Sequence, residues 1–564
     1  MNIGFSRVSA VRRWLVAVPL HQNPVADARD RLSTTLVGIV LLVACAGLFL
    51  TAPVHGDFWW SDAPRHALNG AFLKDFVAAF PWRDPRGWAV DYYLQYPALS
   101  ILFYPPLFYI FEAVAYSILG VTHPAAQATV ILFVFLLGVA SYRIARFTFP
   151  RWSALGLSLL VIGAPETAFW ARQVMLDVPA YAAVVVAAFF FIRYLETDRQ
   201  RDIYLAVFAE LAAVYIKLNA VFIAPVFLMV FILAAGPRAL RRREAIGAAL
   251  LGAVGLVPAV LLTLRFGGVN VQSVAGRQTD LPRTSIEAWL FYAKRLPHDL
   301  GYLTAILAAI GFILLVLSRS ELRQRWIGWL MIGWFGFGYF FFSAIGVREP
   351  RHGLMLEFPL AICAVLALHR FLPTRAAEAA TAGLGFATFV YSLLFMPPPA
   401  IGGYREVADY VAAHAPRNAV VVFSGYRDGN FVFDMRTHEE RRDIATLRAD
   451  KLLLDVAVER LRGVGEKGYD EAAIAKMLRE LGVSLVVFQP GFWQDLREMA
   501  RFAAVLNTRD FQRVASFDIT GTVAHTDRFI EIYKPTYPVE QTEKRLRLDM
   551  PIIGDEFKGD VGTK

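Results

Sequence analysis

Long apolar segments recur through the first two thirds of the chain and constrain its fold more than any other feature. Between residues 34 and about 396 they repeatedly approach the ~20 residues that a helix needs to cross a bilayer. Hydrophobic residues make up 56% of the 564 residues and charged residues only 19%, below the roughly 25% typical of soluble domains. We therefore expect a polytopic α-helical membrane protein.

Basic residues give the chain a net charge of +9, but they fall in short clusters between the apolar segments. That distribution is typical of cytoplasmic loops and argues against a nucleic-acid partner. Both cysteines, Cys45 and Cys363, lie inside apolar segments, so neither a disulfide framework nor a cysteine metal site is indicated. The first apolar segment, 34–51, lacks a short core with a small-residue cleavage site, which favours a retained signal-anchor helix.

The segment 99–120 decides the orientation of everything that follows it. It is apolar but interrupted by Tyr104 and two adjacent prolines, which break backbone hydrogen bonding in a lipid-exposed helix. If it crossed the membrane, the arginines at 143–151 would lie outside, against the positive-inside rule. We therefore expect a re-entrant or surface-lying helix on the outer face.

This choice gives about eleven transmembrane helices and a basic composition for every inside connection. The expected spans are 34–51, 124–147, 152–170, 176–194, 203–215, 221–235, 245–264, 300–317, 326–344, 354–369 and 377–395. The inside clusters are centred on Arg143, Arg199, Arg241, Arg323 and Arg370, together with the N-terminus. The outside then receives the loop 53–123, the turns 173–179, 217–219 and 347–353, the loop 266–299, and everything after 396.

The composition becomes that of a water-soluble domain after three prolines at 397–399. Helix-like segments at 405–414 and 471–481 alternate with strand-like segments at 419–423, 483–488, 514–517 and 528–533, which predicts a small α/β layer domain. The expected organisation is a cytoplasmic N-terminus (1–33), a transmembrane domain (34–396) with the outer loop 53–123, an outer α/β domain (397–540), and a tail (541–564).

Asp62 is the first candidate for chemistry, because it directly follows the first span and is flanked by Trp59, Trp60, Arg65 and His66. A partly desolvated carboxylate tends to have a raised pKa, which suits a general base. The alternative interpretation is a solvated loop carboxylate beside ordinary interfacial tryptophans.

Asp177 begins an otherwise apolar span. A charge so close to hydrocarbon is usually functional or paired. Arg172 is its simplest partner, so a structural ion pair and a catalytic role both remain open. Glu166, near the outer end of the preceding span, is a weaker candidate.

Cationic side chains also gather on the outer face. Lys217 lies between two spans, where it either snorkels or binds a phosphate. Arg351 and His352 lie in a charged outer turn, where the arginine either belongs to an interfacial cluster or holds a phosphate bidentately. Tyr104 supplies a hydroxyl at the same depth. Together with Asp62, these residues suit a reaction in which a lipid-borne phosphate leaves and a hydroxyl attacks.

Five short motifs resemble those of the GT-C superfamily of polyprenyl-phosphate-sugar-dependent glycosyltransferases, most of all the branch of protein O-mannosyltransferases and lipid A aminoarabinose transferases. The family's Asp-Glu-x-Arg-Tyr-Ala corresponds to Asp-Ala-Pro-Arg-His-Ala at 62–67, without the second acid and the tyrosine. Its Lys/His-Pro-Pro-Leu corresponds to Tyr-Pro-Pro-Leu at 104–107, without the basic residue. The remaining three are Leu-Asp-Val-Pro at 176–179, Tyr-Ile-Lys at 215–217 and Arg-His-Gly-Leu-Met at 351–355.

The resemblance implies a polyprenyl-phosphate sugar donor, a lipid, glycan or protein acceptor, and inverting transfer on the outer face of the cytoplasmic (inner) membrane. It implies that Asp62 is the general base and Asp177 a second catalytic residue. The expected donor-phosphate and substrate contacts are Arg65, His66, Tyr104, Arg172, Lys217, Arg351 and His352.

Two questions stay open at this point. The motifs do not demand a metal, although Asp62 and Asp177 are placed where they would share a divalent ion. The main rival is a transporter or flippase for lipids or glycans, which would have inverted repeats and charges near the membrane centre. The sequence has no such repeat, and its charges gather at one face.

Overall fold

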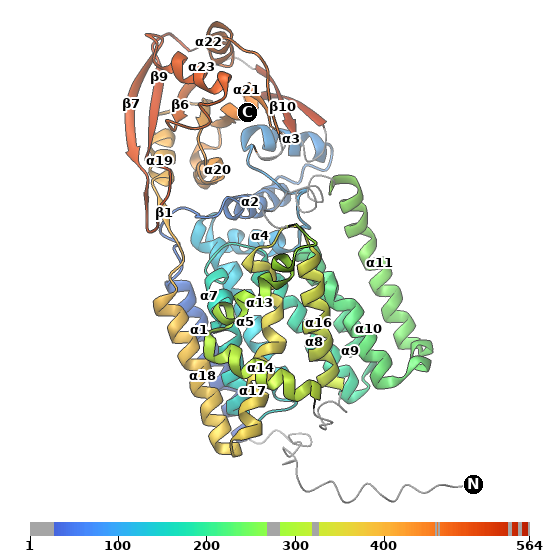
Figure 1. The fold of residues 1–564 in the computed structure, drawn as a ribbon. Helices are drawn as coiled ribbons and strands as arrows, with labels where there is room; N and C mark the ends of the chain where they lie inside the picture. The colour runs from blue at the N-terminus through green and yellow to red at the C-terminus, as the bar shows by residue number, and fades with distance from the viewer. Residues whose placement is uncertain are drawn as a thin grey trace, which may run out of the picture.

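A bundle of long helices carries a strand-containing domain at one end (Figure 1). The computed structural model describes residues 28–267, 282–317, 326–456, 460, 463–539, 544–550 and 555–561. The expected cytoplasmic N-terminus up to residue 27, the inside cluster around Arg323 and the part 268–281 of the outer loop lie outside the described residues.

A helix lies at each of the eleven predicted spans. They are α1 (Ala28–Leu50), α5 (His123–Ala145), α6 (Arg151–Gly163), α8 (Asp177–Thr197), α9 (Gln200–Ile216), α10 (Ile223–Ala235), α11 (Arg243–Phe266), α14 (Tyr302–Leu317), α16 (Trp326–Ala344), α17 (Glu357–Phe371) and α18 (Thr374–Phe395). Within the described residues, seven spans are long and apolar enough to cross a membrane: α5, α8, α11, α16, α18, and α10 and α17 with the 3-10 turns before them. The chain is therefore a multi-pass membrane protein.

The other four helices at predicted spans are shorter or more polar. Over the described residues α1, α6 and α14 have apolar stretches of 10–17 residues, and α9 contains the buried acids Asp202 and Glu210. Small residues let α6 and α18 pack backbone against backbone, as membrane helices often do. A Cβ atom at Gly156 would lie 2.4 Å from the carbonyl oxygen of Thr381, so neither helix tolerates a larger side chain there.

Three helices lie between the bundle and the strand-containing domain (Figure 1). They are α2 (Ala63–Ala79), α3 (Pro85–Gln95) and α4 (Leu107–Leu119). Helices α2 and α4 cross the end of the bundle, and α3 lies against the domain. Helix α4 begins directly after the paired prolines and buries Phe108, Tyr109 and Tyr116 on one side. It packs on α2 so closely that a Cβ at Gly70 would lie 2.5 Å from that of Glu112. Helix α4 thus lies across one end of the bundle and is not a long span, as expected; its position on the outer face stays a prediction.

Short elements connect the long helices at the same end. They are α7 (Pro165–Trp170), η1 (Leu218–Phe222), α13 (Ile286–Leu300) and η3 (Pro350–Leu356). A further short element, η2 (Pro237–Arg241), joins α10 to α11 at the opposite end.

The C-terminal domain is built on a mixed five-stranded sheet with the order β3-β2-β6-β9-β7. Its strands are β2 (Val420–Ser424), β3 (Ala445–Arg448), β6 (Val483–Phe488), β7 (Phe511–Asp518) and β9 (Phe529–Pro535). Strand β2 pairs in parallel with β3 and β6, whereas β9 is antiparallel to β6 and β7. Both central parallel strands are buried along their whole length, as parallel strands covered on both faces require.

Helices and short strand pairs complete the domain. The helices are α19 (Tyr404–His414), α20 (Asp428–Thr437), η4 (Glu439–Arg441), α21 (Ala449–Leu453), α22 (Glu471–Glu480) and α23 (Arg497–Leu506). The short strands are β1 (Ile401–Gly402) with β8 (Thr520–Gly521), and β4 (Leu454–Val456) with β5 (Val464–Glu466). The small α/β domain is confirmed, although the sequence did not predict β3, α20, α21 or α23. The expected tail contains a hairpin of β10 (Lys544–Met550) and β11 (Asp555–Val561).

The C-terminal domain holds the backbone just before Asp62. The amide of Asp57 donates to the Ile401 carbonyl at 2.7 Å, and its carboxylate accepts from the Tyr404 amide at 2.8 Å. Asn430 of α20 donates to the carbonyl of Phe58 at 2.9 Å. The entry into α2 is therefore fixed by contacts more than 340 residues away in sequence.

A buried ion pair ties α2 itself to the domain. Arg436 is 0% exposed and Asp75 is 3% exposed, and two hydrogen bonds of 2.6 and 2.8 Å join the guanidinium to the carboxylate. The Tyr92 hydroxyl donates to the same carboxylate at 2.9 Å, and the half-exposed Arg442 adds a contact of 3.0 Å. Buried charges need this degree of compensation.

Two buried carboxyl groups, Asp57 and Asp434, also lie at this junction and influence each other's pKa. Burial raises the pKa of Asp57 to about 6, and it raises the pKa of Asp434 well above its ordinary value. The other charges that act on the pair come from Arg405, Glu406 and Asp409.

Candidate active site

The motif residues meet where helices end at the side of the bundle that carries the C-terminal domain. Asp62 caps the N-terminus of α2, Asp177 is the first residue of α8, and Lys217 follows the last residue of α9. Arg351 lies in η3, and Tyr104 precedes α4. Motifs that are nearly 300 residues apart in sequence thus contribute to one cluster, which is the candidate active site.

Asp62 and Arg351 form its first ion pair. Both terminal nitrogens of the guanidinium lie 3.4 Å from Oδ2 of Asp62. The Asp62 side chain keeps 36% of its surface exposed, whereas that of Arg351 keeps only 14%. The carboxylate is therefore open to an incoming molecule while the arginine is embedded beneath it.

Asp177 and Lys217 form the second ion pair, with 2.5 Å between Oδ1 and Nζ. The predicted pairing of Asp177 with Arg172 is wrong. The Arg172 guanidinium instead donates to the carbonyls of Ala168, Ser392 and Met396. The last carbonyls of a helix lack partners within it, and Arg172 satisfies those at the end of α18.

The expected rise in the pKa of Asp62 is also wrong. Burial by itself would raise the pKa, but the charge of Arg351, with smaller contributions from His66 and Arg65, lowers it below its ordinary value. Asp62 is consequently ionised at neutral pH, and it is a weak base for as long as Arg351 faces it.

His66 is buried beside two tyrosines. Its Nδ1 lies 2.9 Å from the Tyr109 hydroxyl, and its ring centroid lies 5.2 Å from that of Tyr104. Burial lowers the pKa of His66 to about 4 and raises that of Tyr104. Both residues are neutral at pH 7 and offer hydrogen bonds to a ligand, not charge.

Two other predicted contacts face elsewhere. Arg65 donates to the Asp428 carboxylate of the C-terminal domain at 2.9 Å and to the carbonyl of Ala98 at 3.2 Å. His352 has its Nδ1 3.3 Å from the carbonyl of Val347 in its own turn. Neither arrangement excludes a ligand contact, but Arg65 is already committed to the junction between the domains.

Arg351 has two further neighbours that the sequence did not single out as site residues. Its Nε donates to Glu349 at 2.5 Å, and its guanidinium lies 5.7 Å from the ring centroid of Trp170. The Trp170 ring packs in turn against Trp60, with 5.1 Å between centroids. The charged turn at 347–353 was the available signal for Glu349, but no local pattern could have placed Trp170 under Arg351.

Three carboxylates and two permanent cations therefore share the site. An incoming phosphate must compete with Asp62 and Glu349 for Arg351, and with Asp177 for Lys217. A divalent ion between Asp62 and Asp177 would have to displace one of the same cations.

Residues 104–262 match the family model described as dolichyl-phosphate-mannose-protein mannosyltransferase. This stretch contains Tyr104, Asp177 and Lys217. No curated protein matches the chain in sequence.

Solved structures resemble nearly the whole chain. ArnT from Cupriavidus metallidurans bound to undecaprenyl phosphate has a TM-score of 0.63 at 16% identity, over 89% of this chain and 97% of that one. The oligosaccharyltransferase AglB from Archaeoglobus fulgidus, in complex with an inhibitory peptide and a dolichol-phosphate, has a TM-score of 0.51 at 11% identity, over 85% of this chain and 71% of that one. The fold is ArnT-like, and the middle of the chain matches the mannosyltransferase family model.

Proposed function

We propose that the chain is a glycosyltransferase that moves a sugar from a polyprenyl-phosphate carrier to a hydroxyl of a lipid, glycan or protein. The transfer takes place on the outer face of the cytoplasmic membrane. The observation that carries the proposal is the accessible Asp62 carboxylate paired with Arg351, next to the pair of Asp177 and Lys217. A fold like that of ArnT and AglB, whose structures were solved with lipid phosphates, supports it.

In the proposed reaction Asp62 accepts the proton of the acceptor hydroxyl while the hydroxyl oxygen attacks the anomeric carbon. The bond from that carbon to the phosphate oxygen breaks, and the carrier leaves as a lipid monophosphate. Lys217 and Arg351 stabilise the charge that develops on it. Attack and departure on opposite faces of the sugar invert the anomeric configuration.

In this scheme, binding of the donor raises the basicity of Asp62. The charge of Arg351 is the main factor that opposes burial and lowers the pKa of Asp62. When the donor phosphate shares that guanidinium, the lowering effect weakens and the basicity of Asp62 rises. Asp62 therefore becomes a competent base only after the donor is bound.

The test is an Asp62→Asn variant of the full chain in nanodiscs, assayed with a panel of polyprenyl-phosphate hexoses and pentoses and a cell-envelope extract as acceptor. Loss of the general base should reduce turnover by about 100-fold or more. Binding of undecaprenyl phosphate should be retained or strengthened, because Arg351 loses a competitor. Glu287→Gln, an exposed acid on α13, is the matched control. Near-normal turnover of Asp62→Asn with intact membrane insertion would refute the base role.

A further inference from the structure

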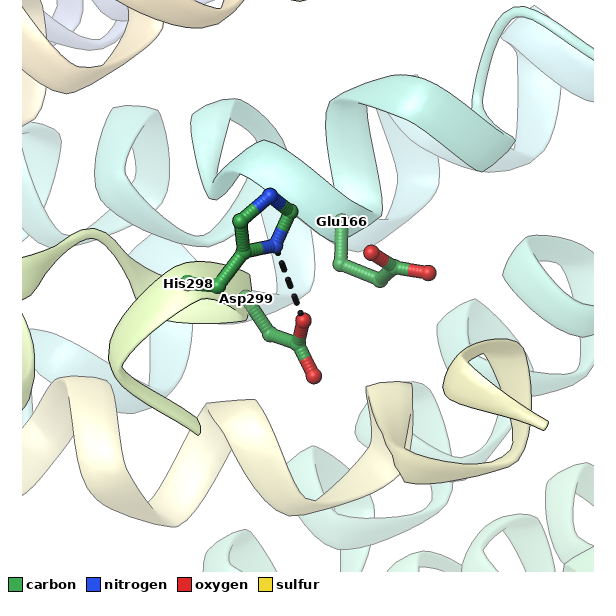
Figure 2. Close-up of side chains that lie close together, drawn as sticks. All are labelled: Glu166, His298 and Asp299. Atoms are coloured by element: carbon green, nitrogen blue, oxygen red, sulfur yellow. Dashed lines mark hydrogen bonds and ion pairs between the residues drawn. The ribbon is translucent and has the colours of Figure 1, made fainter. Parts of the chain in front are cut away.

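A second group of ionisable side chains lies outside the ion pairs described above. Glu166 of α7 faces His298 and Asp299 at the end of α13 (Figure 2). One potential ligand atom from each residue lies within 4.8 Å of the other two, and Nδ1 of His298 is 3.3 Å from Oδ1 of Asp299. Both carboxylates are buried, with 6% and 4% exposure, and the histidine is open to solvent.

A third buried carboxylate is influenced by the group. Glu357, the first residue of α17, is 1% exposed, and the charges of Asp299 and Glu166 act on it. Its Oε2 accepts from the Thr167 hydroxyl at 2.6 Å. Its Oε1 is buried and has no hydrogen-bond partner among the described residues. Leaving such an oxygen unsatisfied is costly, so this atom indicates a ligand that the protein side chains do not supply.

The charges of the group do not balance. One guanidinium nitrogen of Arg295 serves both Glu166, at 3.2 Å, and Asp299, at 3.0 Å. With Glu357 there are three carboxylates against this single permanent cation. Uncompensated buried charges cost several kcal/mol each. The Arg295 side chain is 32% exposed, so part of it already borders solvent.

We propose that Glu166, His298 and Asp299 bind one divalent cation, with Glu357 accepting from a water on that ion. Without the ion, the Arg295 guanidinium neutralises part of the carboxylate charge. When the ion binds, the Arg295 side chain turns outward. One imidazole nitrogen with carboxylate oxygens is a donor set that suits Zn²⁺ first and Mn²⁺ next. The site is separate from the pairs formed by Asp62 and Asp177, and its occupation does not depend on the proposed sugar transfer.

The ion would connect α13 to α7 and reach the candidate active site through one residue. Oε1 of Glu166 accepts from the indole nitrogen of Trp170 at 2.7 Å, and Trp170 lies under the guanidinium of Arg351. A metal held by Glu166 therefore fixes the aromatic surface on which Arg351 rests.

The test is a Zn²⁺ titration of chelator-treated full-length protein in nanodiscs, followed by calorimetry, metal analysis after gel filtration, and melting temperature. We expect one Zn²⁺ per chain and a higher melting temperature. His298→Gln should weaken binding by about tenfold or more, and its exposed position keeps the fold intact. His414→Gln, an exposed histidine of the C-terminal domain, should bind as the wild type does.

Arg295→Met separates a metal site from a simple ion-pair network. If the arginine competes with the ion, its removal should tighten Zn²⁺ binding, and Zn²⁺ should restore the melting temperature of the variant. If the group is only a network of ion pairs, Arg295→Met lowers the melting temperature and Zn²⁺ does not restore it. That result, or equal Zn²⁺ affinity of the wild type and His298→Gln, would overturn the proposal.

Discussion

Replacing Arg436 by methionine tests how the C-terminal domain is held on α2. The substitution removes a fully buried guanidinium and leaves the Asp75 carboxylate, 3% exposed, with Arg442 and the Tyr92 hydroxyl as its remaining partners. Removing one partner of a buried pair costs about 3–5 kcal/mol. Because Arg442 remains, we expect the lower end of that range. About 3 kcal/mol corresponds to a roughly 100-fold larger fraction of molecules with this junction open.

Limited proteolysis of the protein in nanodiscs measures that fraction. When opening and closing are fast relative to cleavage, the cleavage rate follows the open population. Arg497→Met is the matched control, because this arginine is 79% exposed in its pair with Glu466 and such pairs contribute only about 0–1 kcal/mol. Adding Asp75→Asn to Arg436→Met should restore much of the protection, because the unpaired buried charge is then removed. A cleavage rate for Arg436→Met within about threefold of the control would refute the reasoning.

Raising the pH from about 5 to 8 should loosen the same junction. The folded-state pKa of Asp57, about 6, and that of Asp434 are raised, so the stability they contribute is complete below their unfolded values and is lost as the pH rises through the folded values. Asp57→Asn should flatten the pH dependence of proteolysis, and an unchanged slope would contradict the raised pKa of Asp57. At the candidate active site, Lys217→Met should weaken binding of undecaprenyl phosphate by about tenfold or more, measured in nanodiscs, whereas Lys217→Arg should retain most of it. Equal affinities of the two variants would argue against a phosphate contact.

Hydropathy predicted the spans because the requirement to cross a bilayer acts on each segment separately. The prolines after Tyr104 likewise predicted that 99–120 lies on the surface. Strands β2 and β6 were identified because each is a short run of buried apolar residues. Strand β3 at 445–448 was missed, because four residues ending in arginine carry no such pattern.

Partner choice could not be predicted from local sequence. Arg172 is the cation closest to Asp177 in sequence, but its side chain donates to a carbonyl at the end of α18. Lys217, 40 positions away from Asp177, forms the ion pair with it. The pKa of Asp62 was misjudged for the same reason, because its sign depends on Arg351, which is 289 positions away. Burial can be inferred from neighbouring residues, whereas pairing depends on how the helix ends meet.

The C-terminal domain and the segment 57–75 depend on each other's contacts, so they must be transferred together between proteins. A chimera that receives this domain from a relative must also receive the matching segment, or Asp75 and the backbone of Phe58 lose their partners. If the domain is exchanged between relatives, the stretch that carries Asp62 must change with it. Substitutions at Asn430 and Arg436 should therefore be accompanied by substitutions within 57–75, hundreds of residues earlier.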